Sequence, residues 1–172
     1  MKNDGITLIE LIVAVSIVGI LAAALAFEFK GWMGGYKVES QIKEIYVDLM
    51  NARAMAMQKN RIHFVTLTTT RYTIYEDNNP APDGNGILAT ASDTRVLQKN
   101  LNPRHPIIWN GGAQIDFTKR GLSNVDKSIC SNTDIEADYN CIEISPLRIN
   151  IGKLTTKIPG GGLCDSANCV SR

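Results

Sequence analysis

The chain has few of the side chains on which enzymes and nucleic-acid-binding proteins rely. It contains two histidines, His63 and His105, and neither stands in a recognisable nucleophile–base or metal-ligand pattern. The formal net charge at pH 7 is +1, so the overall balance gives no attraction to nucleic acid or to an anionic membrane surface. We therefore expect a protein that is not an enzyme, has no cofactor and does not bind nucleic acid.

One long hydrophobic run is present at the beginning of the chain. Residues 6–27 are apolar or small except for Thr7, Glu10 and Ser16, and Glu10 is the charged one. A helix over this run would be about 33 Å long at ~1.5 Å per residue, enough to cross a ~30 Å hydrocarbon core. An ionisable side chain in such a segment is costly and is by default a functional candidate. Glu10 lies four residues after Ile6, which directly follows Gly5.

This arrangement, GITLIEL followed by apolar residues 12–24, closely resembles the class III signal of type IV pilins and type II secretion pseudopilins. The resemblance implies that a prepilin peptidase cuts between Gly5 and Ile6 and then methylates the new amine of Ile6. It also implies that Glu10 is the assembly carboxylate, which pairs with the amine of a neighbouring subunit. Two features depart from the usual pattern: Ile6 replaces a phenylalanine, and one Asp balances one Lys in the leader, residues 1–5.

Two simpler interpretations compete with the prepilin signal. An ordinary secretory signal has a 7–15-residue apolar stretch and an A-x-A-like cut, for which residues 24–26 are suitable. Here the apolar stretch is longer and carries a glutamate near its beginning. A plain membrane anchor explains the length of the run but not Gly5 together with Glu10. The prepilin interpretation is favoured because it explains the leader, the glutamate and the helix that follows.

The helical pattern continues beyond the apolar run to about Met57. Residues 31–60 form an amphipathic half, whose apolar positions recur at helical spacing: Val38, Ile42, Ile45, Leu49, Ala52 and Ala56. Three glycines within residues 31–35 weaken the helix and allow a bend or local melting. We predict one helix over about residues 6–57, with residues 6–30 in the membrane and later in the filament core.

Residues 61–172 are expected to form a globular, β-rich periplasmic domain, and their number suffices for one compact domain. β-Branched and aromatic stretches predict strands at 62–69, 71–75, 95–101, 107–109 and 114–119, and a second hairpin at 142–151 and 152–158. Residues 123–139 are polar and are expected to be irregular. A long N-terminal helix packed on an antiparallel sheet domain is the α+β ladle fold of pilins, so the pattern and the resemblance agree.

Cysteine occurs only near the end of the chain, at Cys130, Cys141, Cys164 and Cys169. After a membrane-crossing signal these residues would lie in an oxidising compartment, where an even number indicates disulfides. Three connectivities are possible, and we favour 130–141 with 164–169 because each closes a polar loop. Each loop would contribute about 2–3 kcal/mol in the chain-entropy model. Zinc is not expected, because the cysteine spacing differs from that of zinc ribbons.

Two further groups of residues suggest ligand binding only weakly. Asp77, Asn79 and Asp83 offer oxygen atoms in one loop, but the prolines between them break the spacing of a calcium loop, and a solvated turn is favoured. Lys119 and Arg120 could contact phosphate, and some related minor pilins bind DNA through an arginine-rich tail. Here the tail ends with one arginine, Arg172, so solvated charges are favoured.

Taken together, the sequence predicts a minor type IV pilin, a structural subunit of pilus assembly or initiation. Short patches at 49–61 and 115–122 resemble the H-type class of minor pilins and pseudopilins. The expected partners are the prepilin peptidase, other pilin or pseudopilin subunits and the inner-membrane assembly platform. The expected location is the bacterial inner membrane, crossed once with the C-terminal domain in the periplasm, and then the pilus or pseudopilus. The alternatives are a minor pseudopilin of type II secretion, a DNA-binding minor pilin and an unrelated membrane-anchored protein.

Overall fold

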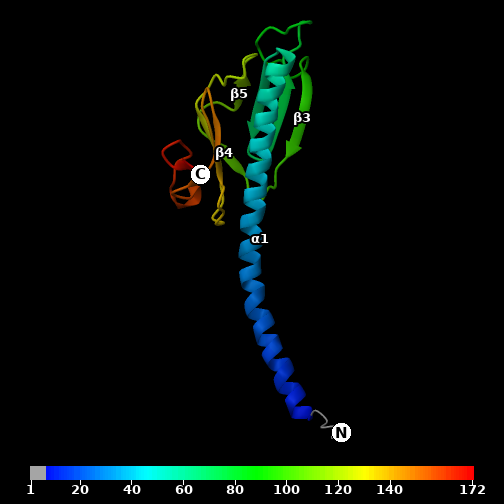
Figure 1. Ribbon diagram of the computed structural model, residues 1–172, viewed down its shortest axis with the longest axis vertical. Helices are drawn as coiled ribbons and strands as arrows, with labels where there is room; N and C mark the ends of the chain where they lie inside the picture. Colours follow the sequence, from blue (N-terminus) through cyan, green and yellow to red (C-terminus); the bar gives the residue numbers. More distant parts are fainter. Residues whose placement is uncertain (1–6) are drawn as a thin grey trace.

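The structure, a computed structural model, describes residues 7–172 and every side chain among them except those of residues 25–31. A long helix, α1 (Leu8–Lys59), runs from one end of the molecule to the other, and the β-strands pack around its C-terminal half (Figure 1). Thr7 caps the beginning of α1. At its end Asn60 adopts a left-handed conformation (φ 51°), and its N–H donates to the carbonyls of Ala56 and Met57.

Within residues 7–172, nine strands form two antiparallel sheets. The four-stranded sheet has the order β3-β2-β1-β5, and the five-stranded sheet has the order β4-β6-β7-β8-β9. The strands are β1 (His63–Thr68), β2 (Arg71–Glu76), β3 (Thr94–Asn100), β4 (Ile107–Trp109), β5 (Gln114–Phe117), β6 (Lys127–Ser131), β7 (Cys141–Ile144), β8 (Ile149–Leu154) and β9 (Cys169–Ser171). A short 3₁₀ helix, η1 (Ile158–Gly160), lies between β8 and β9. The predicted α+β fold is confirmed.

The core lies between α1 and both sheets, on the apolar positions of the amphipathic pattern. All six predicted helix positions from Val38 to Ala56 are buried, as are Val65, Ile115 and Ile142 on the strands. Glycines in α1 allow the five-stranded sheet to come close to the helix. A Cβ atom at Gly35 would lie 2.5 Å from the backbone oxygen of Glu136, in the loop between β6 and β7. Gly34 and Gly35 therefore serve close packing, and α1 remains helical through residues 31–35, where the glycines would have allowed a bend or local melting.

Two predictions about the C-terminal strands were wrong. Residues 123–139, expected to be irregular, contain β6, a central strand of its sheet. Its polar sequence is accommodated because the ammonium of Lys127 donates to the backbone oxygen of Gly112. The second hairpin turns at residues 145–148 rather than between residues 151 and 152, and the tail returns as strand β9.

The cysteine pairing favoured by loop length was also wrong. The disulfides are Cys130–Cys164 and Cys141–Cys169, with sequence separations of 34 and 28 residues. Cys130 and Cys141 face each other in the register of β6 and β7, and each turns to the C-terminal tail for its partner. The pairing of the strands places the cysteines of β6 and β7 next to the C-terminal tail. The lengths of the polar loops, on which the prediction rested, contain no information about this arrangement. Three of the four cysteines are fully buried.

Candidate assembly site

The first turn of α1 positions the predicted assembly carboxylate. The Thr7 side chain accepts a hydrogen bond from the backbone N–H of Glu10 (3.3 Å), and the Thr7 carbonyl accepts one from the N–H of Leu11 (3.2 Å). This is a helix N-cap, and it fixes Glu10 in the positive end of the helix dipole. Our sequence reasoning missed Thr7, although T-x-x-E is a helix-start signal that predicts it. The predicted cleavage site, Gly5 and Ile6, lies outside the described residues.

The helix around Glu10 is exposed and apolar. Ten large hydrophobic side chains between Leu8 and Leu21 are more than half exposed in the isolated chain, and none contacts the globular part. Glu10 shares a face with Ile9, Val13 and Ile17. Among the described residues, the Glu10 carboxylate has no hydrogen-bond or ion-pair partner. A hydrophobic surface of this size marks an interaction site.

Residues 6–30 were expected to cross a membrane, and Ile6 lies outside the described residues. Within the part of the chain that the structure describes, no helix combines the length and the hydrophobicity that crossing a membrane requires.

The loop with the weak calcium candidates is held by its own backbone. Asp77 is buried, and its two carboxylate oxygens accept hydrogen bonds from the N–H groups of Asn85 (3.1 Å) and Gly86 (2.7 Å). A Cβ atom at Gly84 would lie 1.9 Å from Asp77 Oδ1, so the loop closes tightly around this carboxylate. Asp83 is exposed. Among the described residues, no group of three or more acidic, histidine or cysteine side chains is arranged to hold a metal ion.

The candidate phosphate-binding residues lie at two separate places. Lys119 and Arg120 belong to the turn after β5, where Gly121 packs against Met57 near the end of α1. Arg172 instead lies 4.0 Å from the carboxylate of Asp138. Asp138 lines a cleft with Tyr36, about 30 Å from Met57 along α1 at ~1.5 Å per residue. The structure therefore does not bring the three basic side chains into one surface.

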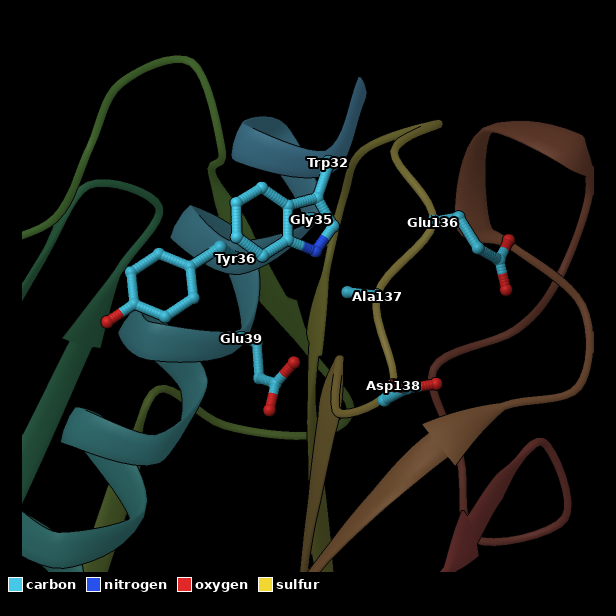
Figure 2. A pocket seen from close by; sticks show the side chains of 7 residues that line it. All are labelled: Trp32, Gly35, Tyr36, Glu39, Glu136, Ala137 and Asp138. Carbon is cyan, nitrogen blue, oxygen red and sulfur yellow. The ribbon is translucent and has the colours of Figure 1, made fainter. Parts of the chain in front are cut away.

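An acidic cleft of about 190 Å³ separates α1 from the loop between β6 and β7. Figure 2 shows Trp32 and Tyr36 of α1 on one side and Glu136 and Asp138 of the loop on the other. The Glu136 side chain points away from α1, and its oxygens lie 2.7 Å and 3.0 Å from the ammonium groups of Lys153 and Lys157. These hydrogen bonds lower the pKa of Glu136 to about 2. The principal carboxylate of the cleft is thus already neutralised within the chain, which argues against a cation site there.

The two histidines are also apart. His63 lies at the beginning of β1, and its Nδ1 is 3.2 Å from the carbonyl oxygen of Arg61. His105 lies between β3 and β4, and its carbonyl oxygen accepts a hydrogen bond from Gln41 of α1 (2.8 Å). Burial lowers the pKa of both imidazoles, so each is more readily neutral than a free histidine.

Comparisons with known proteins found similarities to the N-terminal segment and to the fold of this chain. Residues 1–26 match the family model of the prokaryotic N-terminal methylation motif. The structure is similar to the minor pilin FimU of Pseudomonas aeruginosa, with 15% identity and a TM-score of 0.53, over 70% of this chain and 91% of FimU. It is also similar to the minor pseudopilin EpsH of Vibrio cholerae, with 9% identity and a TM-score of 0.50, over 68% of this chain and 96% of EpsH. No curated protein sequence matches the chain.

The motif and the structural similarity concern different parts of the molecule. The motif covers the leader, Glu10 and the apolar run, whereas at these low identities the similarity to FimU and EpsH shows the fold. The chain thus has the prokaryotic N-terminal methylation motif together with a fold similar to that of the minor pilin FimU and the minor pseudopilin EpsH.

Proposed function

We propose that the chain is a minor type IV pilin, a structural subunit that is made in the inner membrane and built into a pilus or its initiation complex. The observation that carries the proposal is the coincidence of the methylation motif with Glu10, a carboxylate that has no partner among the described residues and lies on an exposed apolar helix. The prepilin peptidase would cut between Gly5 and Ile6, and the amine of Ile6 would be methylated.

Cleavage would supply a chemical partner for Glu10, which has none among the described residues. It creates a positively charged amine on Ile6, four residues before Glu10 in the sequence. In a bilayer an unpaired charge costs up to ~3 kcal/mol at mid-depth. In the water-free core of a filament, the amine of a neighbouring subunit satisfies the carboxylate. Breaking such a buried pair by removing one partner costs about 3–5 kcal/mol, so the pairing fixes the axial register of the two helices.

Variants of Glu10 test the proposal. We expect Glu10→Ala to leave the fold and both disulfides intact, because Glu10 contacts no part of the globular domain. The same variant should fail to enter filaments or initiation complexes. Glu10→Gln should fail nearly as strongly, since it keeps the shape and loses the charge. The measurement is the amount of each variant in sheared filaments and in complexes isolated with neighbouring subunits. Wild-type amounts of both variants would rule out Glu10 as the assembly carboxylate.

A minor pseudopilin of type II secretion is the second candidate, because the structural similarity to EpsH is comparable to that to FimU. The same helix, carboxylate and processing would serve in a pseudopilus. Deleting the gene separates the two functions: loss of surface pili supports the pilin, and loss of protein secretion supports the pseudopilin. The DNA-binding alternative receives no support from the arrangement of Lys119, Arg120 and Arg172.

A further inference from the structure

A basic cleft of about 750 Å³ lies where α1 enters the globular part. Met33 and Lys37 of α1 line it together with Arg104 and His105, from the connection between β3 and β4, and with Ile135, from the loop between β6 and β7. Its volume is within the 300–1,000 Å³ range of small-molecule sites. The lining combines apolar side chains with two cations, Lys37 and Arg104, and with the imidazole of His105, and it includes no carboxylate. This composition suits an amphiphilic anion.

The two cations of the cleft, Lys37 and Arg104, lack counter-ions among the described residues. Among the described residues, neither the Lys37 ammonium nor the Arg104 guanidinium forms an ion pair or a side-chain hydrogen bond. His105 is 5% exposed, and its Nδ1 has no hydrogen-bond partner. Most other cations near α1 are paired; Lys43, for example, is paired with Glu39. The cleft therefore concentrates unneutralised positive charge.

The wall of the cleft is fixed to α1 by the buried side chain of Gln41. Its Nε2 donates to the carbonyl oxygen of His105 (2.8 Å), and its Oε1 accepts from the backbone N–H of Asn102 (2.9 Å). The Asn102 side chain in turn accepts from the backbone N–H of Arg104 (3.0 Å). These bonds hold Arg104 and His105 beside Lys37, so the basic groups are positioned before any ligand arrives.

The position of the cleft indicates where its ligand comes from. Met33 and Lys37 precede the buried stripe of α1, which begins at Val38, so the cleft lies at the end of the globular part nearest to the N-terminal half of α1. Lys37 is about 15 Å beyond the end of the apolar run at ~1.5 Å per residue. When the apolar run lies in a bilayer, the headgroup layer covers part of this distance and the long side chain of Lys37 can cover the rest, so its ammonium can reach a lipid phosphate.

We infer that the basic cleft binds the phosphate of an anionic phospholipid, with Lys37 and Arg104 on the phosphate oxygens and Met33 and Ile135 against the first carbons of the acyl chains. Arg is suited to this contact because its guanidinium can donate two parallel hydrogen bonds to a phosphate. The bound lipid would hold the globular domain in one orientation on the membrane before assembly. The inference rests on the proposed function in one respect, that the chain is anchored in a membrane before it is assembled.

The test uses the full chain in zwitterionic detergent micelles, titrated with phosphatidylglycerol, with the thermal unfolding midpoint as readout. We expect the midpoint of the wild type to rise with phosphatidylglycerol and not with phosphatidylcholine. The double variant Lys37→Gln with Arg104→Gln should require at least tenfold more phosphatidylglycerol for the same rise. The control, Lys119→Gln with Arg120→Gln, removes the same charge from an exposed turn and should respond like the wild type.

Two outcomes would overturn the inference. One is an equal response of the cleft variant and the wild type, which would place the lipid elsewhere. The other is a response to inorganic phosphate as large as that to phosphatidylglycerol, which would show that the cleft binds free phosphate and does not require a lipid. The thermal midpoint does not depend on cleavage or on assembly. Normal processing without a lipid response therefore contradicts this inference alone, and a lipid response in a chain that is not cut after Gly5 contradicts the proposed function alone.

Discussion

The two disulfides bind the C-terminal tail to the sheet, and removing one of them should destabilise the globular domain strongly. Replacing Cys141 and Cys169 with alanine opens a link whose sequence separation is 28 residues. Treated alone, a loop of that length is worth about 3.6 kcal/mol in the chain-entropy model. For a domain of this size, such a loss lowers the thermal midpoint by roughly 7–14 °C. Circular dichroism of the full chain, oxidised and reduced, measures the change.

The same double variant separates the two connectivities. If the pairs were 130–141 and 164–169, the variant would break both disulfides, and the two short loops together would be worth about 5 kcal/mol. A loss of that larger size, with Cys130 and Cys164 left as free thiols, would argue against the structure. Removal of Cys130 and Cys164, which are 34 residues apart, is the matched comparison and should cost about as much as removal of the first pair.

Trypsin provides a direct check of the pairing. It cuts after Lys127, Arg148 and Lys157, so Cys130 and Cys141 stay in fragment 128–148 and the other two cysteines stay in fragment 158–172. We expect the non-reduced digest to contain these two fragments joined as one species. Two separate fragments, each with an internal disulfide, would refute the interleaved pairing. Further cleavage at Asp134, Asp138 and Asp165 identifies which cysteine meets which.

Two other changes test the packing of the helix against the sheets. Glu76 is buried, which raises its pKa, but hydrogen bonds from Lys59 and Arg61 outweigh burial and hold the pKa below its usual value. Its stabilising effect is therefore complete above the ordinary glutamate pKa of about 4.3 and is lost as the pH falls through the lowered value. Chemical denaturation between pH 6 and pH 3 should show a steeper loss for the wild type than for Glu76→Gln; parallel curves would contradict the pairing. Gly35→Ala should lower stability by about 1–2 kcal/mol, because the clash with the Glu136 carbonyl outweighs the ~1 kcal/mol gain in helix propensity. Gly112→Ala, where the new Cβ meets nothing within 4 Å, should change stability by less than about 0.5 kcal/mol, and equal effects at the two sites would refute the close-packing argument.

The parts of the molecule with local patterns could be predicted from the sequence. The buried stripe from Val38 to Ala56 follows helical periodicity, and the strands of the first hairpin follow their β-branched residues, so both were predicted closely. Strand β6 was missed because its sequence, KSICS, resembles a polar loop. It is a strand because its neighbours in the sheet provide partners for its polar groups, and no local pattern records those neighbours.

The candidate sites show the same division. Glu10 could be recognised from its spacing to Gly5 within an apolar run. The basic cleft could not, because Lys37 and Arg104 are far apart in sequence and are brought together by the packing of the β3–β4 connection and by the hydrogen bonds of Gln41. Disulfide pairing is likewise a property of the sheet register, in which Cys130 lies opposite Cys141.

The mature N-terminus is the most direct test of the central claim, which is that this chain is a prepilin. Mass spectrometry of the protein purified from cells with its prepilin peptidase should find a chain that begins at Ile6 and carries one methyl group on its amine. The same chain from cells without the peptidase should begin at Met1. A mature protein that begins at Phe27, after an ordinary secretory cut, would contradict the claim, as would a chain that keeps residues 1–5 in the presence of the peptidase.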